Sequence, residues 1–472
     1  MLLNRNYYLN KLKGCWVGKN IGGTIGGPYE SSRTMLDVKG FSTPKGEPLP
    51  NDDLDLQLVW LLAVEHRGIK AITPQVLAEY WLDFIPAVWN EYEIGKANLR
   101  LGLLPPYSGE YNNEKWKNSN GAWIRTEIWA CLFPGKPDLA VRYAYYDACV
   151  DHGMGEGTFA AMFIAALESA AFFESDIRKL IEKGLSYIPE NCRVAQCVRL
   201  AIKLYDEKKD IVTARNTIVE SVSDMGWFQA PGNIGFVILG LLYGEKDYKK
   251  SILTAVNCGD DTDCTAATVG SILGIIYGFN GIPQDWSEYV GDKIVSISIN
   301  LSFYYAKSCS ELSKRVYELV PSCFMAYGIY MEYTDGENDL TENARWILPD
   351  ISLPKTGLSF DFPDLIYAKG RVELSACEIA PDETIELTFT FKDTSRYPRQ
   401  IEVELSLPES WTADKKYARL YTKAISDKEE SVVTVKVTAG ECVNLKNVIN
   451  ARIGCVDRPA KCSSEIIIWG KN

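Results

Sequence analysis

The sequence predicts a multidomain protein in which a large all-α domain is followed by a small antiparallel β-sandwich. The chain has 472 residues, which is more than a single hydrophobic core usually organises. Residues 1–335 contain apolar stripes of helical length, whereas from residue 359 the hydrophobic pattern alternates with a period of two. We therefore expect an all-α domain over residues 1–335, a polar linker over 336–358 and a β-sandwich over 359–472.

Helices are predicted where long apolar stripes are separated by short turns rich in Gly, Pro and Asn. Each of these stripes is long enough for an α-helix, unlike the shorter stretches further along the chain. The clearest cover residues 54–65, 158–173, 194–204, 234–243 and 266–277.

Strands are predicted in the C-terminal part of the chain, where hydrophobic and polar residues alternate. Residues 384–392, 401–407 and 432–437 alternate cleanly, and 451–453 and 465–469 have the pattern of shorter or more buried strands. Short strands broken by turns at this spacing are typical of an antiparallel sandwich.

Residues 407–411 read Leu-Pro-Glu-Ser-Trp, which resembles a turn of immunoglobulin-like accessory modules. The resemblance implies an immunoglobulin-like sandwich. No aromatic platform of the kind that binds carbohydrate is evident in the sequence of this part. We therefore expect the sandwich to pack against the first domain or to contact a protein partner.

Charge and cysteine usage exclude several classes of protein. The net charge is −12, with 62 acidic against 50 basic residues and no basic run, so general binding to nucleic acid is not expected. The sequence lacks a signal-peptide-like apolar stretch at its start and any apolar window long enough to span a membrane. Thirteen cysteines without a CxxC pair favour reduced thiols, and we expect a cytoplasmic protein that does not bind membranes.

Two acidic clusters, more than 200 residues apart, are the strongest candidates for a functional site. Residues 51–55 read Asn-Asp-Asp-Leu-Asp and residues 259–265 read Gly-Asp-Asp-Thr-Asp-Cys-Thr, and each precedes a predicted helix. Helix capping or simple surface acidity would explain a single acid at such a position. Adjacent carboxylates, however, repel one another unless a cation neutralises them. Oxygen ligands without histidine favour a hard cation, Mg²⁺ before Mn²⁺ or Ca²⁺.

Small residues recur every four positions in two stretches near these clusters. On a helix this spacing forms a ridge that lets another backbone approach closely, although the first stretch could instead include loop glycines. We expect at least the second ridge to pack tightly beneath the acidic site. The two sets are Gly14, Gly18, Gly22 and Gly26, and Ala266, Gly270, Gly274 and Gly278.

Five segments in the same order resemble the motifs of the ADP-ribosylglycohydrolase family, of the dinitrogenase-reductase-activating glycohydrolase type. They are the glycine-rich segment 14–30, the Asn-Asp-Asp of 51–53, the Asn-Gly-x-x-x-Arg of 120–125, the Asp-His-Gly of 151–153 and the acidic segment 256–270. The resemblance covers about residues 10–330. It implies an all-α fold, a dinuclear Mg²⁺ centre and release of ADP-ribose from modified side chains or related conjugates.

The resemblance also implies roles for individual residues. Glu30 or Asp53 would orient or deprotonate the attacking water. Backbone N–H groups around Gly121 and Gly153 would hold the diphosphate. The implied substrate-binding residues are Asn120, Gly121, His152, Gly153 and Gly155, and the implied ligands of one or two Mg²⁺ ions (or Mn²⁺) are Asn51, Asp52, Asp53, Asp261, Asp263 and Cys264.

Three residues depart from the family pattern. Asn51 replaces Thr, Cys264 replaces Thr or Ser, and Gly23 stands where Asp is common. A soft sulfur is a poor ligand for Mg²⁺, so the second metal position is expected to be weak. A non-catalytic module that binds ADP-ribose or a nucleotide through a degenerate metal site is therefore the alternative reading.

Overall fold

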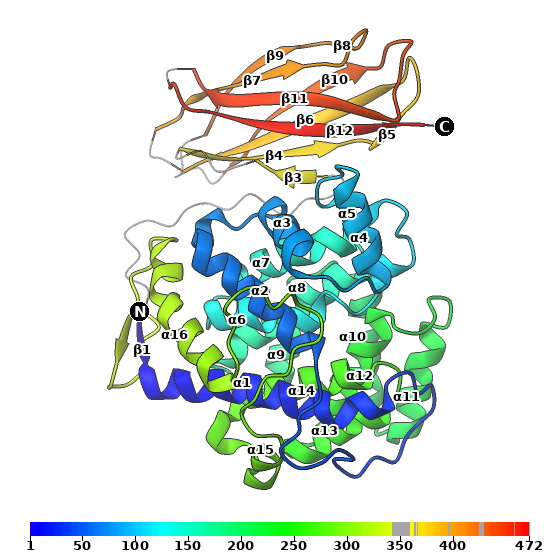
Figure 1. Ribbon diagram of the computed structural model, residues 1–472, viewed down its shortest axis with the longest axis vertical. Coiled ribbons are helices and arrows are strands. Elements are labelled where there is room, and N and C mark those ends of the chain that lie inside the picture. Colours follow the sequence, from blue (N-terminus) through cyan, green and yellow to red (C-terminus); the bar gives the residue numbers. More distant parts are fainter. Residues whose placement is uncertain are drawn as a thin grey trace.

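A helical domain and a β domain follow one another along the chain in the computed structural model (Figure 1). Most of the predicted linker, residues 342–358, lies outside the described part of the chain. The described residues are 1–341, 359–362, 365, 367–394, 397–423, 429–456 and 458–471.

The first domain is helical, as predicted, apart from a short parallel pairing of β1 (Leu2–Asn4) with β2 (Glu332–Thr334). The five predicted helical stretches overlap α2, α8, α10, α12 and α14. The helices are α1 (Arg5–Gly26), α2 (Asp52–Arg67), α3 (Pro74–Phe84), α4 (Asn90–Arg100), α5 (Tyr107–Glu110), α6 (Glu127–Leu132), α7 (Pro137–His152), α8 (Glu156–Ala171), α9 (Ile177–Leu185), α10 (Arg193–Asp206), α11 (Ile211–Ser221), α12 (Ala230–Tyr243), α13 (Tyr248–Asn257), α14 (Thr262–Tyr277), α15 (Gln284–Val290) and α16 (Cys309–Met325).

Helices α1 and α14 pack antiparallel along the two predicted ridges, which confirms the close approach expected there. A Cβ atom added at Gly18 would overlap the carbonyl group of Gly270, and one added at Gly22 would overlap the backbone of Ala266. All four ridge glycines of α1 lie within the helix rather than in a loop. Glycine disfavours helix by about 1 kcal/mol per residue, so the packing of the two backbones must offset that cost.

Two five-stranded sheets form the second domain and share one core, in which Phe389, Val435, Ile453 and Ile468 are fully buried. Their order is β3-β4-β6-β10-β8 and β5-β12-β11-β7-β9. Because β5 pairs parallel with β12, the second sheet is mixed rather than purely antiparallel. The strands are β3 (Ser359–Asp361), β4 (Ala368–Leu374), β5 (Glu378–Ile379), β6 (Thr384–Asp393), β7 (Gln400–Ser406), β8 (Thr412–Ala413), β9 (Tyr417–Tyr421), β10 (Ser431–Thr438), β11 (Lys446–Cys455) and β12 (Lys461–Gly470).

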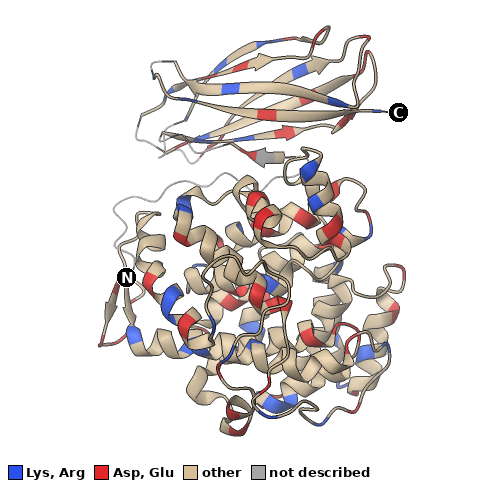
Figure 2. Ribbon diagram, viewed as in Figure 1, with Lys and Arg blue, Asp and Glu red and all other residues tan. Residues whose placement is uncertain are grey.

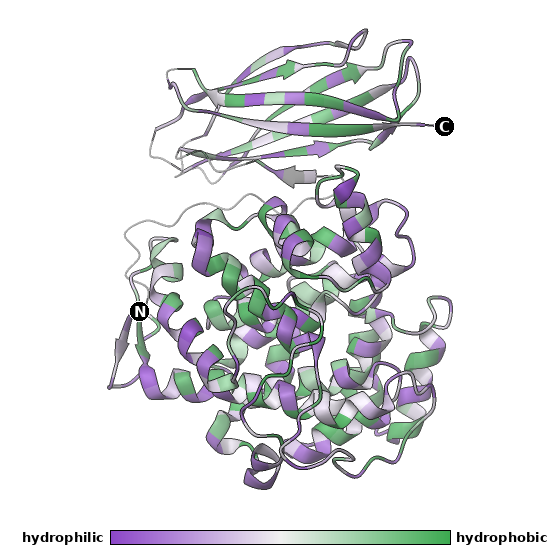
Figure 3. Cartoon of the chain, viewed as in Figure 1, coloured by the Kyte–Doolittle hydropathy of each residue, from purple (hydrophilic) through white to green (hydrophobic). Residues whose placement is uncertain are grey.

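The strands show the alternation on which their prediction depended. Figure 3 shows hydrophilic and hydrophobic residues following one another along the sheet strands. In β7, for example, burial alternates at every position from Ile401 to Leu405. This pattern places one face of the strand in the shared core and the other toward solvent. The immunoglobulin-like assignment stays a prediction.

The sandwich contacts the helical domain through residues 103–118, here called the α5 segment. Leu103 and Tyr107 are buried in the hydrophobic core of the sandwich rather than in that of the helical domain. The ring of Tyr111 stacks on that of Trp469, with centroids 6.2 Å apart. The α5 segment is therefore held between the two domains, which lie against each other at this point in Figure 1.

Lys and Arg are scattered over both domains in Figure 2 rather than gathered on one face. Among the described residues, no helix has the length and apolar character needed to cross a bilayer. Most of the thirteen cysteines are buried free thiols.

Replacing Gly270 with Ala tests the contact between α1 and α14. We expect a loss of about 1–3 kcal/mol in the free energy of unfolding, because the new methyl group meets backbone that has no rotamer to change. Thermal unfolding should show a lower midpoint. Gly40→Ala is the control, since a Cβ atom there would have no neighbour within 4 Å. Equal midpoints for the two variants would contradict the close contact.

Candidate active site

The ends of three helices meet at one cavity of about 520 Å³ in the helical domain. Glu30 follows the C-terminal end of α1, Asp52 begins α2, and Asp261 and Asp263 lie at the start of α14. All four carboxylates line the cavity. Figure 2 shows acidic segments gathered near the centre of this domain. The positive ends of the α2 and α14 dipoles favour negative charge here, so the helix geometry supports both acidic clusters.

Backbone hydrogen bonds hold Glu30 beside the second cluster. Ser31 N–H donates to the carbonyl oxygen of Asp260 at 2.8 Å, and Asp260 N–H donates to that of Ser32 at 2.6 Å. Oxygen atoms of Glu30, Asp261 and Asp263 consequently lie within 4.8 Å of one another. The structure thus brings Glu30 together with two carboxylates that lie more than 200 residues further along the chain.

A second group consists of Asp53, Asp263 and Cys264, whose ligand atoms also lie within 4.8 Å of one another. The Cys264 thiol donates to Asp53 Oδ1 at 3.3 Å. Asp53 Oδ2 and Asp263 Oδ1 are buried and accept no hydrogen bond from any described residue. Buried carboxylate oxygens normally have a partner, so Asp263 Oδ1 is free to bind a cation, whereas Asp53 Oδ2 faces the Lys19 ammonium group 3.6 Å away.

The crowded carboxyl groups hold their protons more tightly than usual. Burial, together with the nearby Asp263 and Asp260, raises the pKa of Glu30 to about 7. Burial also raises the pKa of Asp53 to about 7, although Lys19 opposes the shift. The pKa of Asp261 is raised by burial and then by Asp263. A bound cation would reverse these shifts by stabilising the ionised forms.

Lys19 is a fully buried cation behind the site, and sequence reasoning missed its role. Its Nζ lies 2.5 Å from Glu127 Oε1 and 3.6 Å from Asp53 Oδ2. Burial alone would lower the pKa of Lys19, but Glu127 and Asp53 outweigh burial and raise it. The ammonium group therefore fixes one oxygen of Asp53. The spacing of residues 14–20 gave no signal of this pairing, because Glu127 comes from a distant helix.

Asn51 and Asn120 orient acids of the site. Asn51 caps α2, and its Oδ1 accepts the N–H of Asp53 at 2.9 Å. A Cβ atom at position 23 would overlap the Asn51 amide, so Gly23 leaves the space that Asn51 needs. Asn120 Nδ2 donates to Asp261 Oδ2 at 2.7 Å. Both amides thus contact the acidic clusters directly.

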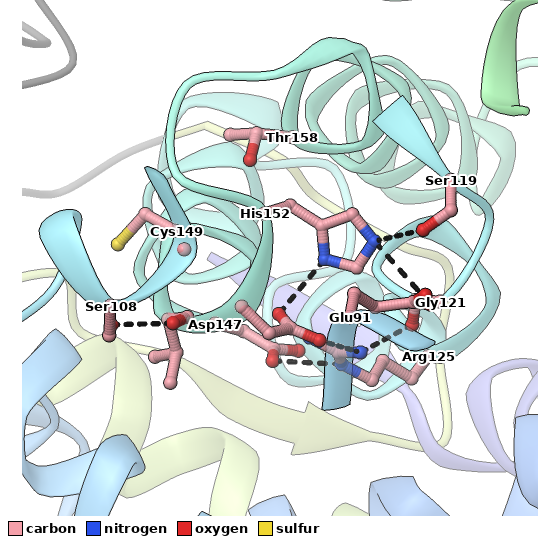
Figure 4. A network of polar contacts seen from close by, with 12 residues as sticks. Glu91, Ser108, Ser119, Gly121, Arg125, Asp147, Cys149, His152 and Thr158 are labelled. Atoms are coloured by element: carbon pink, nitrogen blue, oxygen red, sulfur yellow. Dashed lines mark hydrogen bonds and ion pairs between the residues drawn. The ribbon is translucent and has the colours of Figure 1, made fainter. Parts of the chain in front are cut away.

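The structure places His152 in a buried network rather than on the cavity wall (Figure 4). Its Nδ1 lies 3.0 Å from Asp151 Oδ1, and its Nε2 lies 3.2 Å from Ser119 Oγ and 3.8 Å from Glu91 Oε1. Arg125 pairs with the same Asp151 at 2.8 Å. Ser119 and Glu91 do line the cavity. His152 therefore supports the wall from behind.

Residues 152–157, here called the Gly153 turn, are covered by the α5 segment. The N–H of Met154 donates to Glu110 Oε1 at 2.5 Å, and that of Glu156 donates to Asn118 Oδ1 at 3.0 Å. Gly155 packs so closely that an added Cβ atom would overlap the carbonyl group of Lys117. Among the described residues, the cavity wall includes no member of this turn. Of the substrate-binding residues expected from the sequence, only Asn120 and Gly121 reach the cavity.

Aromatic side chains form much of the remaining wall. Trp89, Tyr92, Trp116 and Phe228 all line the cavity. The backbone of Phe228 has φ 61°, which is rare for a bulky residue, and its N–H donates to both Asp260 carboxylate oxygens. Trp123, inside the Asn-Gly segment of 120–125, is fully buried and does not line the cavity. Aromatic content alone could not show which of these rings face the site.

Curated relatives match parts of the chain. An uncharacterized protein of Archaeoglobus fulgidus is 23% identical over 328 residues, which cover 66% of this chain and 96% of that protein. The ADP-ribosylarginine hydrolase Tri1 of Serratia proteamaculans is 26% identical over 102 residues, 21% of this chain and 24% of that enzyme. The Pseudomonas putida protein of the same name is 38% identical over 52 residues, 11% of this chain and 14% of that enzyme. The chain therefore matches about a quarter or less of these hydrolases.

A solved structure, titled ADP-ribosylglycohydrolase-related protein complex, is 18% identical in sequence and has a TM-score of 0.45. The match covers 67% of this chain and 99% of the chain in that structure. The chain also matches a model of a whole protein family. The ADP-ribosylglycohydrolase family model matches residues 4–319, which include α1 to α15, most of α16 and every residue of the acidic site. The chain therefore belongs to the ADP-ribosylglycohydrolase family.

Proposed function

We propose that the chain is a hydrolase that uses one or two divalent ions, Mg²⁺ or Mn²⁺, to cleave the N- or O-glycosidic bond of a ribosyl conjugate. Membership of the family supports glycosidic hydrolysis. Two relatives are named ADP-ribosylarginine hydrolase, which makes ADP-ribose conjugates the first class to test. The observation that carries the proposal is the meeting of Glu30, Asp261 and Asp263 in the cavity wall.

The donor atoms fit a divalent cation. Buried oxygens of Asp53 and Asp263 lack hydrogen-bond partners among the described residues, and the clustered carboxylates need a counter-charge. Asn51 can offer only one lone pair of its amide oxygen, because the other accepts the Asp53 N–H. When bound, the ion would neutralise the acids and polarise a sugar oxygen. The proposed ligands are Asn51, Asp52, Asp53, Asp261, Asp263 and Cys264.

Glu30 is the better placed of the two proposed bases. It lines the cavity, where a water molecule can reach it, and a bound cation would keep its carboxyl group ionised, as a base requires. Asp53 is fully buried and is held by Lys19 and Cys264. We therefore assign proton abstraction to Glu30 and orientation of the cluster to Asp53.

The reaction is a substitution at the anomeric carbon. A water molecule loses a proton to Glu30 while its oxygen forms a bond to that carbon. The bond to the aglycone breaks and its electron pair leaves with the aglycone, which takes up a proton where it would otherwise leave as an anion. The transition state is oxocarbenium-like. Nearby carboxylates stabilise the positive charge that develops on the sugar.

Cys264 favours a second candidate, a non-catalytic binding module. Its sulfur stands in the second ligand group, where Mg²⁺ prefers oxygen. The pKa of the thiol is raised well above its usual range by burial and by Asp261, so the neutral form is favoured in the metal-free protein. A module of this kind would bind its ligand without turnover.

Metal binding should stabilise the protein against heat. We expect millimolar Mg²⁺ or Mn²⁺ to raise the unfolding midpoint, because an ion at about 100 times its dissociation constant adds about 2.7 kcal/mol to the stability. Asp261→Asn should remove most of this effect, since Asp261 belongs to the group made of three carboxylates. Asp37→Asn is the control, as its side chain is 83% exposed. A midpoint that no divalent ion shifts would exclude the metal site.

The metal-induced rise in the unfolding midpoint should be larger at pH 8 than at pH 6. Burial raises the pKa of both Glu30 and Asp53 to about 7, so at pH 6 protons compete with the ion. The stability of the metal-free protein should change with pH in the opposite direction. Its folded state binds these protons more tightly than the unfolded chain, so their contribution to stability falls as pH rises from about 4 to about 7. Unfolding followed with and without Mg²⁺ at both pH values checks both signs.

Glu30→Gln should lower kcat by roughly 10²–10⁴-fold, the usual contribution of a general base. Release of ADP-ribose from ADP-ribosylated arginine is the first assay. The rise in unfolding midpoint at saturating Mg²⁺ should persist, since Asp261 and Asp263 remain. Glu93→Gln, on the exposed side of α4, is the matched control. Unchanged turnover in Glu30→Gln would contradict the assignment of the base, and ligand binding without turnover in the wild type would favour the binding module.

A further inference from the structure

We propose that this cavity takes a ribosyl conjugate without phosphate groups, with an uncharged or cationic flat aglycone. The inference rests on the proposed function and narrows its substrate class. It departs from the diphosphate-binding role that the sequence suggested for the backbone around Gly121 and Gly153. Four features of the described residues carry it.

The charge of the wall is the first feature. Five carboxylates line the cavity and, among the described residues, no Lys or Arg does. Two divalent ions and Lys19 would together supply five positive charges, whereas seven carboxylates lie in or directly behind the wall, so no positive charge would be left for a diphosphate. The seven are Glu30, Asp52, Asp53, Glu91, Glu127, Asp261 and Asp263.

The closed Gly153 turn is the second feature. Glycine-rich turns at helix N-termini bind phosphate through free N–H groups. Here the N–H of Met154 is bonded to Glu110 and that of Glu156 to Asn118. A diphosphate would have to displace both side chains, and one of them is a carboxylate.

The position of Glu91 is the third feature. A Cβ atom added at Gly121 would overlap Glu91 Oε1, so this carboxylate lies directly against the glycine. Burial raises the pKa of Glu91, and His152 opposes the shift. Phosphate oxygens at Gly121 would therefore meet a carboxyl group that already occupies the neighbouring space.

Three cations close to this wall, which belong to the first feature, are engaged elsewhere. Lys117 pairs with Glu110 Oε2 at 2.6 Å, and Lys115 lies over the ring of Trp116, 4.1 Å from its centroid. Lys19 is buried behind Asp53. A phosphate group would have to break one of these interactions to pair with any of the three lysines.

The aromatic wall is the fourth feature and indicates what the cavity accepts. Trp89, Tyr92, Trp116 and Phe228 offer ring faces and edges to a ligand. Trp89 is 44% exposed, so its ring is accessible to a ligand. Ring faces bind flat or cationic groups well. A heteroaromatic or guanidinium-like aglycone beside an acidic sugar site fits this combination.

The test compares three probes with the same N-ribosyl bond: nicotinamide riboside, nicotinamide mononucleotide and NAD⁺. Binding to the full-length protein is measured by calorimetry with millimolar Mg²⁺, and nicotinamide release is measured in parallel. We expect affinity to fall from the riboside through the mononucleotide to NAD⁺, by about tenfold overall, which corresponds to about 1.4 kcal/mol. NAD⁺ binding as tightly as the riboside would overturn the inference, and so would the absence of binding by all three probes.

Glu91→Gln identifies the cause of the selectivity. Because the side chain keeps its shape and loses its charge, the ratio of riboside to NAD⁺ affinity should narrow several-fold. Glu93→Gln removes the same charge from the same helix outside the cavity and should leave the ratio unchanged. A ratio that neither variant alters would contradict the role given to Glu91.

The two readouts separate this inference from the proposed function. If the riboside binds most tightly but is not hydrolysed, the proposed hydrolase function is contradicted and the inferred ligand class is supported. If NAD⁺ or an ADP-ribosyl conjugate binds more tightly than the riboside and is hydrolysed efficiently, the hydrolase function is supported and the inferred ligand class is contradicted.

Discussion

The close contact between α1 and α14 is the constraint on which the rest of the site depends. Each helix presents small residues every four positions, so the two backbones touch along the whole length of the ridges. Because the helices run antiparallel, the end of α1 meets the start of α14. Glu30 and Asp261 therefore face one cavity although 230 residues separate them in sequence. A wider helix pair could not hold these carboxylates close enough to share a cation.

Much of this arrangement could be predicted from the sequence because its signals are local. The glycine spacing, the acidic clusters at Asp52 and Asp261 and the alternation in the strands are each contained within a short stretch. What could not be predicted depends on contacts between distant segments. The pairing of Lys19 with Glu127 is one case, and the cover that Glu110 forms over the Gly153 turn is another. In both cases the sequence motif is present as expected, and contacts from distant segments of the chain determine what the motif can bind.

Charge balance links the core of the helical domain to its cavity. Lys19 neutralises part of the charge of Asp53 and Glu127 from inside, whereas Glu30 and Asp261 face the cavity, whose described lining contains no Lys or Arg. Burial raises the pKa of these acids, so the metal-free site is held together partly by bound protons. The site is thus preorganised for a cation on one side and fixed by an internal ammonium group on the other.

The position of the α5 segment gives the C-terminal domain a part in the architecture of the cavity. One end of the segment places Leu103 and Tyr107 in the sandwich core, and the other end covers the Gly153 turn through Glu110 and Asn118. Loss of the sandwich would leave those two apolar side chains without their partners. The α5 segment would then be free to move away from the Gly153 turn. Exchange of this domain between relatives would therefore remodel the ligand specificity of the neighbouring domain, even with every acid of the site unchanged.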